Sequence, residues 1–368
     1  MMKSTHNYLF VSDLHLSEGW DPHTGKFSRN EDFFYDTEFA QFLVYHVKLA
    51  QEADSGDPYD KPWKLFINGD AFDFLQVTSL PPDDHPLFTK YGIDLTDNKR
   101  EYGLGTSEPE TVWKLKKIVD GHPVFFQALG WFLAHEGNEL VLLKGNHDIE
   151  IFWPKVQSAL RHLIDEKYRL WRAEMTQGYA PDTPLTYDSS MPDILEELDE
   201  RIIFPTWLYH EPELFFVEHG SQYDPANMFR NFITPTIPDR PDMVELPSGS
   251  FLVRYFFNKI EQLHPFADNL RPLGRYVNWA LNYELVDTMK MVLRNPRTII
   301  KFLSNFLGKQ RKQAKLEDKT AVPNEPVEQT DYTLQKKRVD ELRTVQAQFL
   351  AIGQQKSTRS SLATFSGF

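Results

Sequence analysis

The 368-residue chain contains no cysteine and no long hydrophobic run. The first absence excludes disulfide bonds and thiolate metal ligands, so nothing in the protein depends on an oxidising compartment, and a cytoplasmic location is expected. The second leaves no candidate for a membrane-spanning helix, which needs about 20 mostly apolar residues. The first residues lead into a predicted strand without the apolar segment of a signal peptide, which fits the same location.

Positive charge is scarce in most of the chain. The net charge is −13, which argues against nucleic-acid binding, because that needs a positive face to displace counterions. Residues 250–315 are the exception, with twelve basic and four acidic side chains among many aromatic ones. Two interpretations of this segment stay open: a helical insertion whose basic side faces water, or an amphipathic cap that contacts anionic lipid or a phosphorylated amphiphile at the inner membrane face.

The composition, 41% hydrophobic and 14% aromatic, is typical of a globular protein, and the length is sufficient for one large domain or a core with a sizeable insertion. Apolar residues at helical spacing predict helices at 36–51, 111–119, 123–135 and 152–166. The predicted parts are a core at 1–230 with a long loop at 76–110 over the site, a basic, aromatic helical insertion or cap at 231–315, a linker at 316–333, and a C-terminal helix with a polar tail at 334–368.

Four short motifs stand out in the first 220 residues, and each follows an apolar run that predicts a β-strand. Runs of this kind, rich in Val, Ile, Leu and Phe, suggest strands buried on both faces. Because ligands of open α/β sheets bind outside the carboxyl ends of the strands, the motifs are expected to meet at one site. The runs are residues 8–11, 63–67, 140–143 and 214–217, and the motifs after them are Ser12-Asp13-Leu14-His15, Asn68-Gly69-Asp70-Ala71-Phe72-Asp73, Lys144-Gly145-Asn146-His147-Asp148 and Glu218-His219-Gly220.

The motifs offer oxygen and nitrogen ligands for metal ions. Asp13 and His15 lie two residues apart on a segment predicted to be extended, so both side chains would point the same way and bind one ion. Asp70 supplies a carboxylate that can bridge two ions, Asn146 an amide oxygen and His219 an imidazole nitrogen. This mixture of donors suits Mn, Fe or Zn better than calcium.

In these motifs the chain resembles the calcineurin-like metallophosphoesterase family, whose pattern is Asp-x-His, Gly-Asp-x-x-Asp, Gly-Asn-His-Asp/Glu and a lone His before a Gly. One such motif is a weak signal, but four in the family's order, each after a predicted strand, are specific. The resemblance implies a four-layer α/β/β/α sandwich, here with a helical basic insertion, and a site for two divalent metal ions.

The resemblance also implies which residues bind the ions. Asp13 and His15 would bind the first ion. Asn146 and His219 would bind the second, and Asp70 would bridge the two.

The same resemblance assigns the catalytic residues. His147 would stabilise charge at phosphorus or protonate the leaving oxygen, and Asp73 would hold the imidazole of His147 in one tautomer. Asp148 would assist them.

The fifth motif of the family, a Gly-His-x-His that completes the ligand sets of both ions, is missing. The last of the twelve histidines is His264, and the chain ends in a polar segment rich in Ser and Thr. Three explanations are open: the chain is truncated relative to the family, other histidines such as His23, His85 or His210 substitute, or the site is degenerate. Truncation is favoured, because the other motifs are intact and the ending is typical of neither a strand nor a docked helix.

The leading functional prediction is a hydrolase that cleaves a phosphomonoester, phosphodiester or pyrophosphate bond with metal-activated water. Within the family, the first motif, the His-Gly pair and the basic insertion look most like the UDP-diacylglucosamine hydrolase branch, so the expected substrate is a phosphorylated small molecule or lipid. The alternative is a catalytically impaired scaffold or membrane-associated binding protein of the same fold. Metal content separates the two, because only the enzyme needs bound ions.

Overall fold

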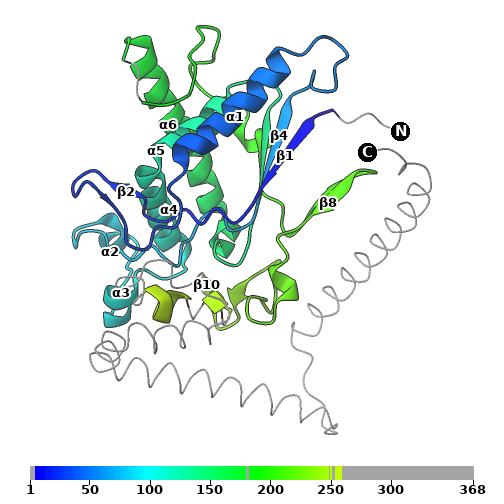
Figure 1. The fold of residues 1–368 in the computed structure, drawn as a ribbon. Coiled ribbons are helices and arrows are strands. Elements are labelled where there is room, and N and C mark those ends of the chain that lie inside the picture. The colour runs from blue at the N-terminus through cyan, green and yellow to red at the C-terminus, as the bar shows by residue number, and fades with distance from the viewer. Residues whose placement is uncertain (1–4, 180–181, 248, 251–252, 259–368) are drawn as a thin grey trace, which may run out of the picture. The chain divides into compact units, whose positions relative to one another are not determined.

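A parallel sheet forms the centre of the protein. The computed structural model describes residues 5–179, 182–247, 249–250 and 253–258. Its main sheet has four strands in the order β1-β4-β5-β6, all parallel to their neighbours. These strands are β1 (Asn7–Val11), β4 (Trp63–Asn68), β5 (Glu139–Leu143) and β6 (Ile202–Ile203). The fold is therefore mixed α/β, as the sequence predicts (Figure 1).

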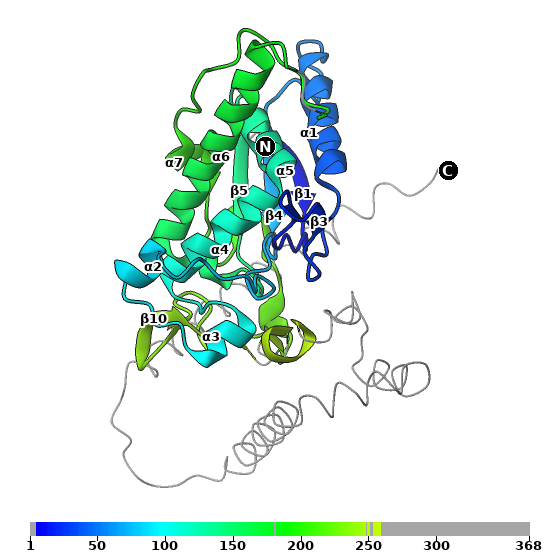
Figure 2. The same ribbon diagram turned by 90° about the vertical axis from the view of Figure 1, so that its left-hand side faces the viewer.

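Helices cover one face of this sheet (Figures 1 and 2). They contact the strands through one hydrophobic core that includes Leu9, Leu65 and Leu140. The covering helices are α1 (Asp36–Gln51), α4 (Glu108–Gly121), α5 (Pro123–Leu133) and α6 (Pro154–Thr176). All four predicted helices are thus present, and α1 has the predicted bounds.

A two-stranded antiparallel hairpin packs on the opposite face of the sheet. It consists of β7 (Tyr209–Glu211) and β8 (Phe215–Val217). Its side chains contact Phe66, Val141 and Leu143 from the central strands. The described residues therefore build three layers: helices, parallel sheet and hairpin. A second helical layer outside the hairpin, which the four-layer fold requires, is not found within them.

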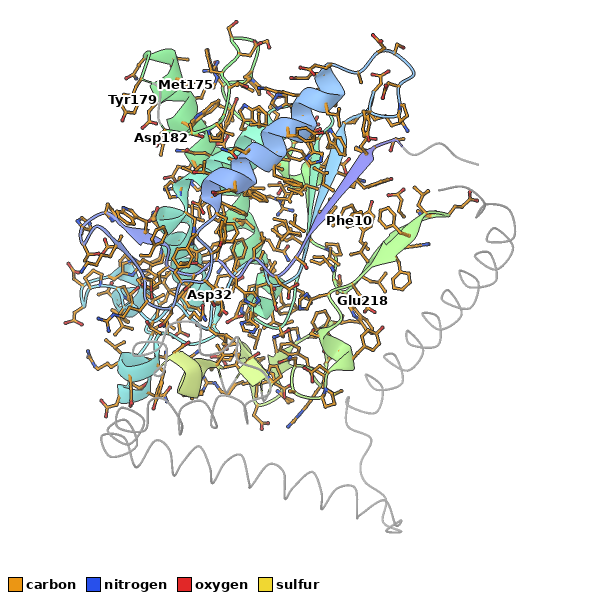
Figure 3. The ribbon with its side chains drawn as sticks, viewed as in Figure 1. Phe10, Asp32, Met175, Tyr179, Asp182 and Glu218 are labelled. Atoms are coloured by element: carbon orange, nitrogen blue, oxygen red, sulfur yellow. The ribbon has the colours of Figure 1, made fainter. Side chains whose placement is uncertain are left out.

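Two predictions about the strands are wrong. The run at 214–217 lies in the hairpin and not in the main sheet, and the side chains of β8 are only partly buried. Strand β1 is also incompletely buried, with Phe10 48% exposed. The reason is its position at the sheet edge, where one side of Phe10 packs against Phe215 at 5.2 Å between ring centroids and the rest faces solvent (Figure 3).

Further differences concern loops. The segment 76–110 contains two short helices, because His85 and Thr96 accept a hydrogen bond from the backbone two or three residues ahead and so begin a helical turn. His210, one of the histidines considered as substitute ligands, is the middle residue of β7. The remaining elements are β2 (Trp20–Asp21), β3 (Lys26–Phe27), α2 (Pro86–Thr89), α3 (Asp97–Tyr102), α7 (Leu198–Arg201), β9 (Thr236–Ile237), β10 (Arg240–Val244), the 3-10 helices η1 (Ile149–Phe152) and η2 (Ser221–Tyr223), and the π-helical turn η3 (Val253–Phe257).

Several predictions lie largely or wholly outside the described residues. They are the insertion or cap at 231–315 beyond residue 258, the linker at 316–333, and the helix and tail at 334–368. Among the described helices, none combines the length and the apolar character that crossing a membrane requires.

A buried ion-pair cluster joins the loop after β1 to the helical layer. The imidazole of His122 lies 3.1 Å from the carboxylate of Glu31 and 2.9 Å from that of Asp36. Burial alone would lower the pKa of His122, but the two carboxylates raise it to about 9. The carboxylate of Glu31 also accepts hydrogen bonds from the backbone N–H of Ser17 and Gly19. This cluster therefore holds the segment that leads out of the first motif.

The raised pKa of His122 predicts a pH dependence of stability. In the folded protein His122 stays protonated up to about pH 9, whereas its ordinary value is 6.5. The stabilisation is therefore complete below about pH 6.5 and is lost as the pH rises towards 9. The free energy of unfolding should exceed that of His122→Phe by a margin that shrinks by roughly 3 kcal/mol across this window. Urea unfolding of both proteins at pH 6 and pH 9.5 measures it, and a difference that does not change with pH would contradict the assignment.

Candidate metal centre

The first two motifs are joined through their backbones beyond the ends of β1 and β4. The N–H of Asp13 donates to the carbonyl of Gly69 at 3.1 Å, and the N–H of His15 donates to the carbonyl of Asp70 at 2.9 Å. The pairing of the two strands thus continues into the loops that carry the candidate ligands. As a result, residues far apart in the sequence lie side by side at the carboxyl edge of the sheet.

The backbone at these positions is not extended, which corrects the prediction for Asp13 and His15. Strand β1 ends at Val11, and the φ angles of Asp13, His15 and Asp70 are 53°, 54° and 50°. These values lie in the left-handed region, which Asp, Asn and His enter more readily than most residues. The side chains of Asp13 and His15 are therefore placed by a backbone that follows the second motif, and not by alternation along a strand.

Two groups of possible metal donors share the carboxylate of Asp70. One consists of Asp13, Asp70 and His219, and the other of His15, Asp70 and His147, with the donor atoms of each group within 4.8 Å of one another. Oδ2 of Asp70 lies 3.2 Å from Nε2 of His219 and 3.9 Å from Nε2 of His15. A carboxylate in this position can serve both groups.

Asn146 lies beside the group that contains His219. Its Oδ1 is 3.4 Å from Nε2 of His219. The structure therefore brings together all five side chains predicted as ligands, but it groups them differently. Asp13 lies with His219 and not with His15, and His147 joins His15, with ring centroids 4.6 Å apart. Metal binding by these residues stays a prediction.

Burial and nearby charges shift the pKa values of Asp70 and His219 in opposite directions. Burial would raise the pKa of Asp70, but His147, His219 and His15 lower it to about 2. For His219, burial would lower the pKa, and the hydrogen bond and charge of Asp70 raise it to about 9. Nδ1 of His219 lies 2.9 Å from the carbonyl oxygen of Asn68. This contact orients the ring so that Nε2 points to Asp70.

Asp73 orients two imidazoles, where the sequence predicts one. Its Oδ2 lies 2.5 Å from Nδ1 of His147 and 3.4 Å from Nδ1 of His15. Burial opposes the charge of Asp73, but the two histidines hold its pKa far below the usual range. An ionised Asp73 fixes the proton of His147 on Nδ1, so Nε2 is the nitrogen available for chemistry.

Asp148 fastens two motif loops to each other. One of its oxygens accepts a hydrogen bond from the N–H of Gly145 at 2.5 Å, and the other accepts one from the N–H of Ala71 at 2.7 Å. Complete burial and the nearby charge of Asp70 raise the pKa of Asp148 to about 7. Its contacts are those of a positioning residue.

Sequence reasoning missed other carboxylates that position the loops. Besides Glu31, the carboxylate of Glu18 accepts hydrogen bonds from the N–H of Thr78 at 2.7 Å and of Ser79 at 2.8 Å, which ties the first motif loop to the segment after the second. No motif marks such residues, because a glutamate in a loop has the same local signal whether it is solvated or buried. Only their acidic character beside the motifs could have drawn attention to them.

The histidines considered as substitutes for the missing pair do not join the donor groups within the described part of the chain. His23 lies in the exposed turn between β2 and β3, and His85 begins helix α2. His210 is exposed on β7. His264 lies outside the described residues.

Two glycines are required for the close approach of the motifs. A Cβ at Gly69 would lie 2.4 Å from the ring of His219, and a Cβ at Gly145 would lie 2.1 Å from Oδ1 of Asp70. Both distances are far shorter than van der Waals contact. The positions of His219 and Asp70 therefore depend on the absence of a side chain at these two positions.

Substitution of Gly145 tests this constraint. Gly145→Ala should displace the Asp70 carboxylate and weaken Mn binding at least about tenfold, since misplaced ligands lose affinity steeply. Gly178→Ala is the control for a general loss of stability, because an alanine there is strained by a φ of 79° but its Cβ meets no atom within 4 Å. Titration of Mn into the three proteins measures the effect. Equal affinities would show that Asp70 is not part of the metal centre.

No family model matches the chain, and no curated protein and no solved structure matches it either. The resemblance to the calcineurin-like metallophosphoesterases therefore rests on the four motifs alone. What the structure adds is geometric: the motifs meet at one edge of the sheet and share one carboxylate.

Proposed function

We propose that the protein is a metal-dependent phosphoesterase that hydrolyses a phosphomonoester, phosphodiester or pyrophosphate bond. The observation that carries this proposal is the pair of donor groups that share Asp70 at the carboxyl edge of a parallel sheet. Shared carboxylates are typical of two-metal sites, which activate water and hold phosphoryl oxygens during in-line displacement. The proposal includes the complete four-layer α/β/β/α fold of the calcineurin-like metallophosphoesterases.

The chemistry of the donors fits two divalent ions of the Mn, Fe or Zn type. Carboxylate, amide and imidazole donors converge, and thiolates are absent from the sequence. Each of the three imidazoles also has an oxygen partner on its Nδ1: the carbonyl of Asn68 behind His219, and the carboxylate of Asp73 behind His15 and His147. Such partners are characteristic of histidines that bind metals, because they fix the tautomer and the ring orientation.

Each residue has a role in this proposal. Asp13, His15, Asp70, Asn146 and His219 would hold the ions, which supply hydroxide at neutral pH and positive charge for the phosphoryl oxygens.

The residues around these ligands carry out the remaining steps. His147, with its Nδ1–H bound to Asp73, delivers a proton from Nε2 to the leaving oxygen or stabilises charge at phosphorus. Asp148 holds the second and third motif loops together.

We infer a phosphorylated small molecule or lipid as substrate, no nucleic acid, and a cytoplasmic protein that contacts the inner membrane face through the basic segment 250–315. The basic, aromatic composition of that segment supports the membrane contact. The absence of cysteine supports the location.

A second candidate function is a catalytically impaired scaffold or binding protein. It is favoured by the donor count, since each group has three His or Asp members within the described residues. Metal content separates the candidates. A chain that binds no Mn, Fe or Zn after purification and reloading is the scaffold.

Removal of the shared carboxylate is the first test. Asp70→Asn should lose most bound metal, because one amide oxygen cannot neutralise two ions. Asp83→Asn, in an exposed loop, is the control for loss of one carboxylate. Elemental analysis of the reloaded proteins should give about two ions per chain for the control. Retention of both ions by Asp70→Asn would contradict the shared role.

Replacement of His147 tests the acid. His147→Ala should keep its metal and lose turnover of a nitrophenyl phosphodiester by about 10²–10⁴-fold, which is usual for a lost acid or base. Because His147 lies in one donor group, loss of metal in this variant would identify it as a ligand instead. Asp73→Asn should share the loss of turnover, since the imidazole would lose its fixed tautomer.

A further inference from the structure

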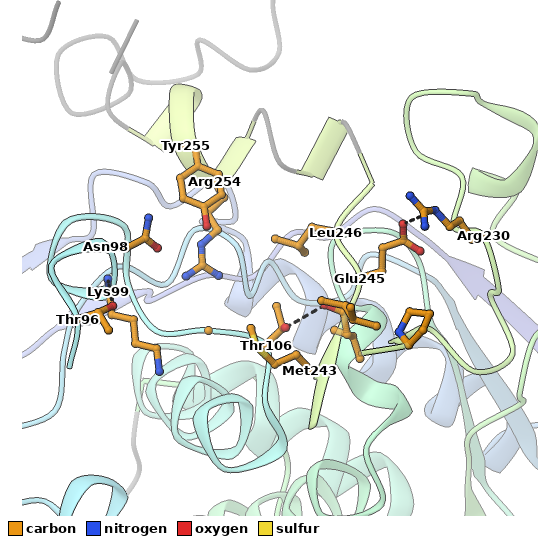
Figure 4. Close-up of a pocket in the computed structure, with 14 residues that line it drawn as sticks. Thr96, Asn98, Lys99, Thr106, Arg230, Met243, Glu245, Leu246, Arg254 and Tyr255 are labelled. Atoms are coloured by element: carbon orange, nitrogen blue, oxygen red, sulfur yellow. Dashed lines mark hydrogen bonds and ion pairs between the residues drawn. The ribbon is translucent and has the colours of Figure 1, made fainter. Parts of the chain in front are cut away.

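A cavity lined by none of the motif residues has the properties of a ligand site. It lies between helix α3, the β9–β10 hairpin and the η3 turn, and its volume is ≈ 390 Å³ (Figure 4). Sites for small organic molecules have volumes of about 300–1,000 Å³. None of its lining residues belongs to the donor groups of the metal centre.

The cavity contains a buried cation whose charge the described residues do not neutralise. Arg254 is 4% exposed and lines the cavity. Its Nη2 donates to the carbonyl oxygens of Gly103 at 2.9 Å and Leu104 at 2.6 Å, and its buried Nε has no hydrogen-bond partner. Figure 4 shows the guanidinium directed towards the space between Lys99 and Leu246. Within the described ranges, no carboxylate lies at ion-pair distance from it.

The other cations of the cavity are paired. Nζ of Lys99 lies 2.7 Å from Glu110, and Nε of Arg230 lies 3.2 Å from Glu245. Among the lining residues that the structure describes, Arg254 is thus the cation without a carboxylate partner, and a buried charge without a counterion is costly. An anion in the cavity would remove this cost.

Much of the remaining lining is apolar. Ile237, Met243 and Leu246 form a wall on the side of the β9–β10 hairpin. A purely inorganic anion would leave this wall in contact with water. A ligand that carries both an anionic group and a short apolar part would satisfy the cation and cover the wall.

We propose that this cavity binds an organic anion whose carboxylate or phosphate group meets Arg254 and whose apolar part packs against Met243 and Leu246. Charge-assisted hydrogen bonds to a guanidinium are among the strongest in proteins, and they strengthen further when water is excluded. The site is independent of the phosphoesterase proposal, because no donor residue lines it.

Calorimetric titration of the full-length chain with heptanoate tests the proposal. Heptanoate should bind with a dissociation constant below about 1 mM, whereas heptan-1-ol, which has the tail without the charge, and acetate, which has the charge without the tail, should bind at least about tenfold more weakly. Hexyl phosphate in place of heptanoate shows which head group the site prefers. Equal binding of heptanoate and heptan-1-ol, or no binding of either anion at about 10 mM, would overturn the proposal.

Variants locate the binding. Arg254→Gln removes the cation, and Met243→Trp reduces the space in the cavity while the arginine is kept; each should weaken heptanoate binding at least about tenfold. Arg169→Gln, which removes an exposed cation on α6, should leave it unchanged. If Arg254→Gln does not fold, the binding of heptanoate to Met243→Trp tests the location alone. Unchanged binding in that variant would show that heptanoate does not bind in this cavity. Asp70→Asn should bind heptanoate normally, and loss of binding there would place the probe at the metal centre instead.

Discussion

The carboxylate of Asp70 is the group around which the other motifs are arranged. It is almost completely buried, and a buried charge without partners would cost several kcal/mol. Three residues supply partners for this charge. The N–H of His147 donates to Oδ1 at 2.8 Å, and the rings of His219 and His15 lie on the side of Oδ2. Loops from three different strands must therefore close on one carboxylate. This is also why Gly145, whose Cβ would collide with that carboxylate, cannot carry a side chain.

Three further carboxyl groups, those of Glu18, Glu31 and Asp148, hold the same loops through hydrogen bonds from the backbone. Loops without regular structure leave N–H groups that need partners when water is excluded. Glu31 accepts hydrogen bonds from N–H groups of the segment after the first motif, and Glu18 accepts them from the segment after the second. Asp148 links the second and third motifs. Hydrogen bonds to an ionised acceptor are stronger than those to a neutral one. The framework around the candidate centre is thus built by carboxyl groups that bind backbone, and it leaves the imidazoles for the proposed metal-binding role.

The sequence predicts the regular elements well where local pattern and burial agree. Helix α1 follows the predicted span because Phe39, Leu43 and Val47 repeat at the spacing of one buried helical face. Strands β4 and β5 are buried on both faces, as their apolar runs indicate. The prediction is wrong for β1 and β8, because composition cannot show that a strand lies at an edge or in a separate hairpin.

What the sequence by itself determines is the set of chemical groups and their order: four motifs after four strands, no thiolates, and no terminal histidine pair. Which donors share a group was decided only by the tertiary structure. The left-handed backbone at Asp13, His15 and Asp70, together with the hydrogen bonds that join the first two motif loops, places Asp13 beside His219 and His15 beside His147. The physical reason is that local spacing fixes where a side chain points relative to its own strand, whereas the meeting of loops from different strands depends on pairing and burial across the whole sheet.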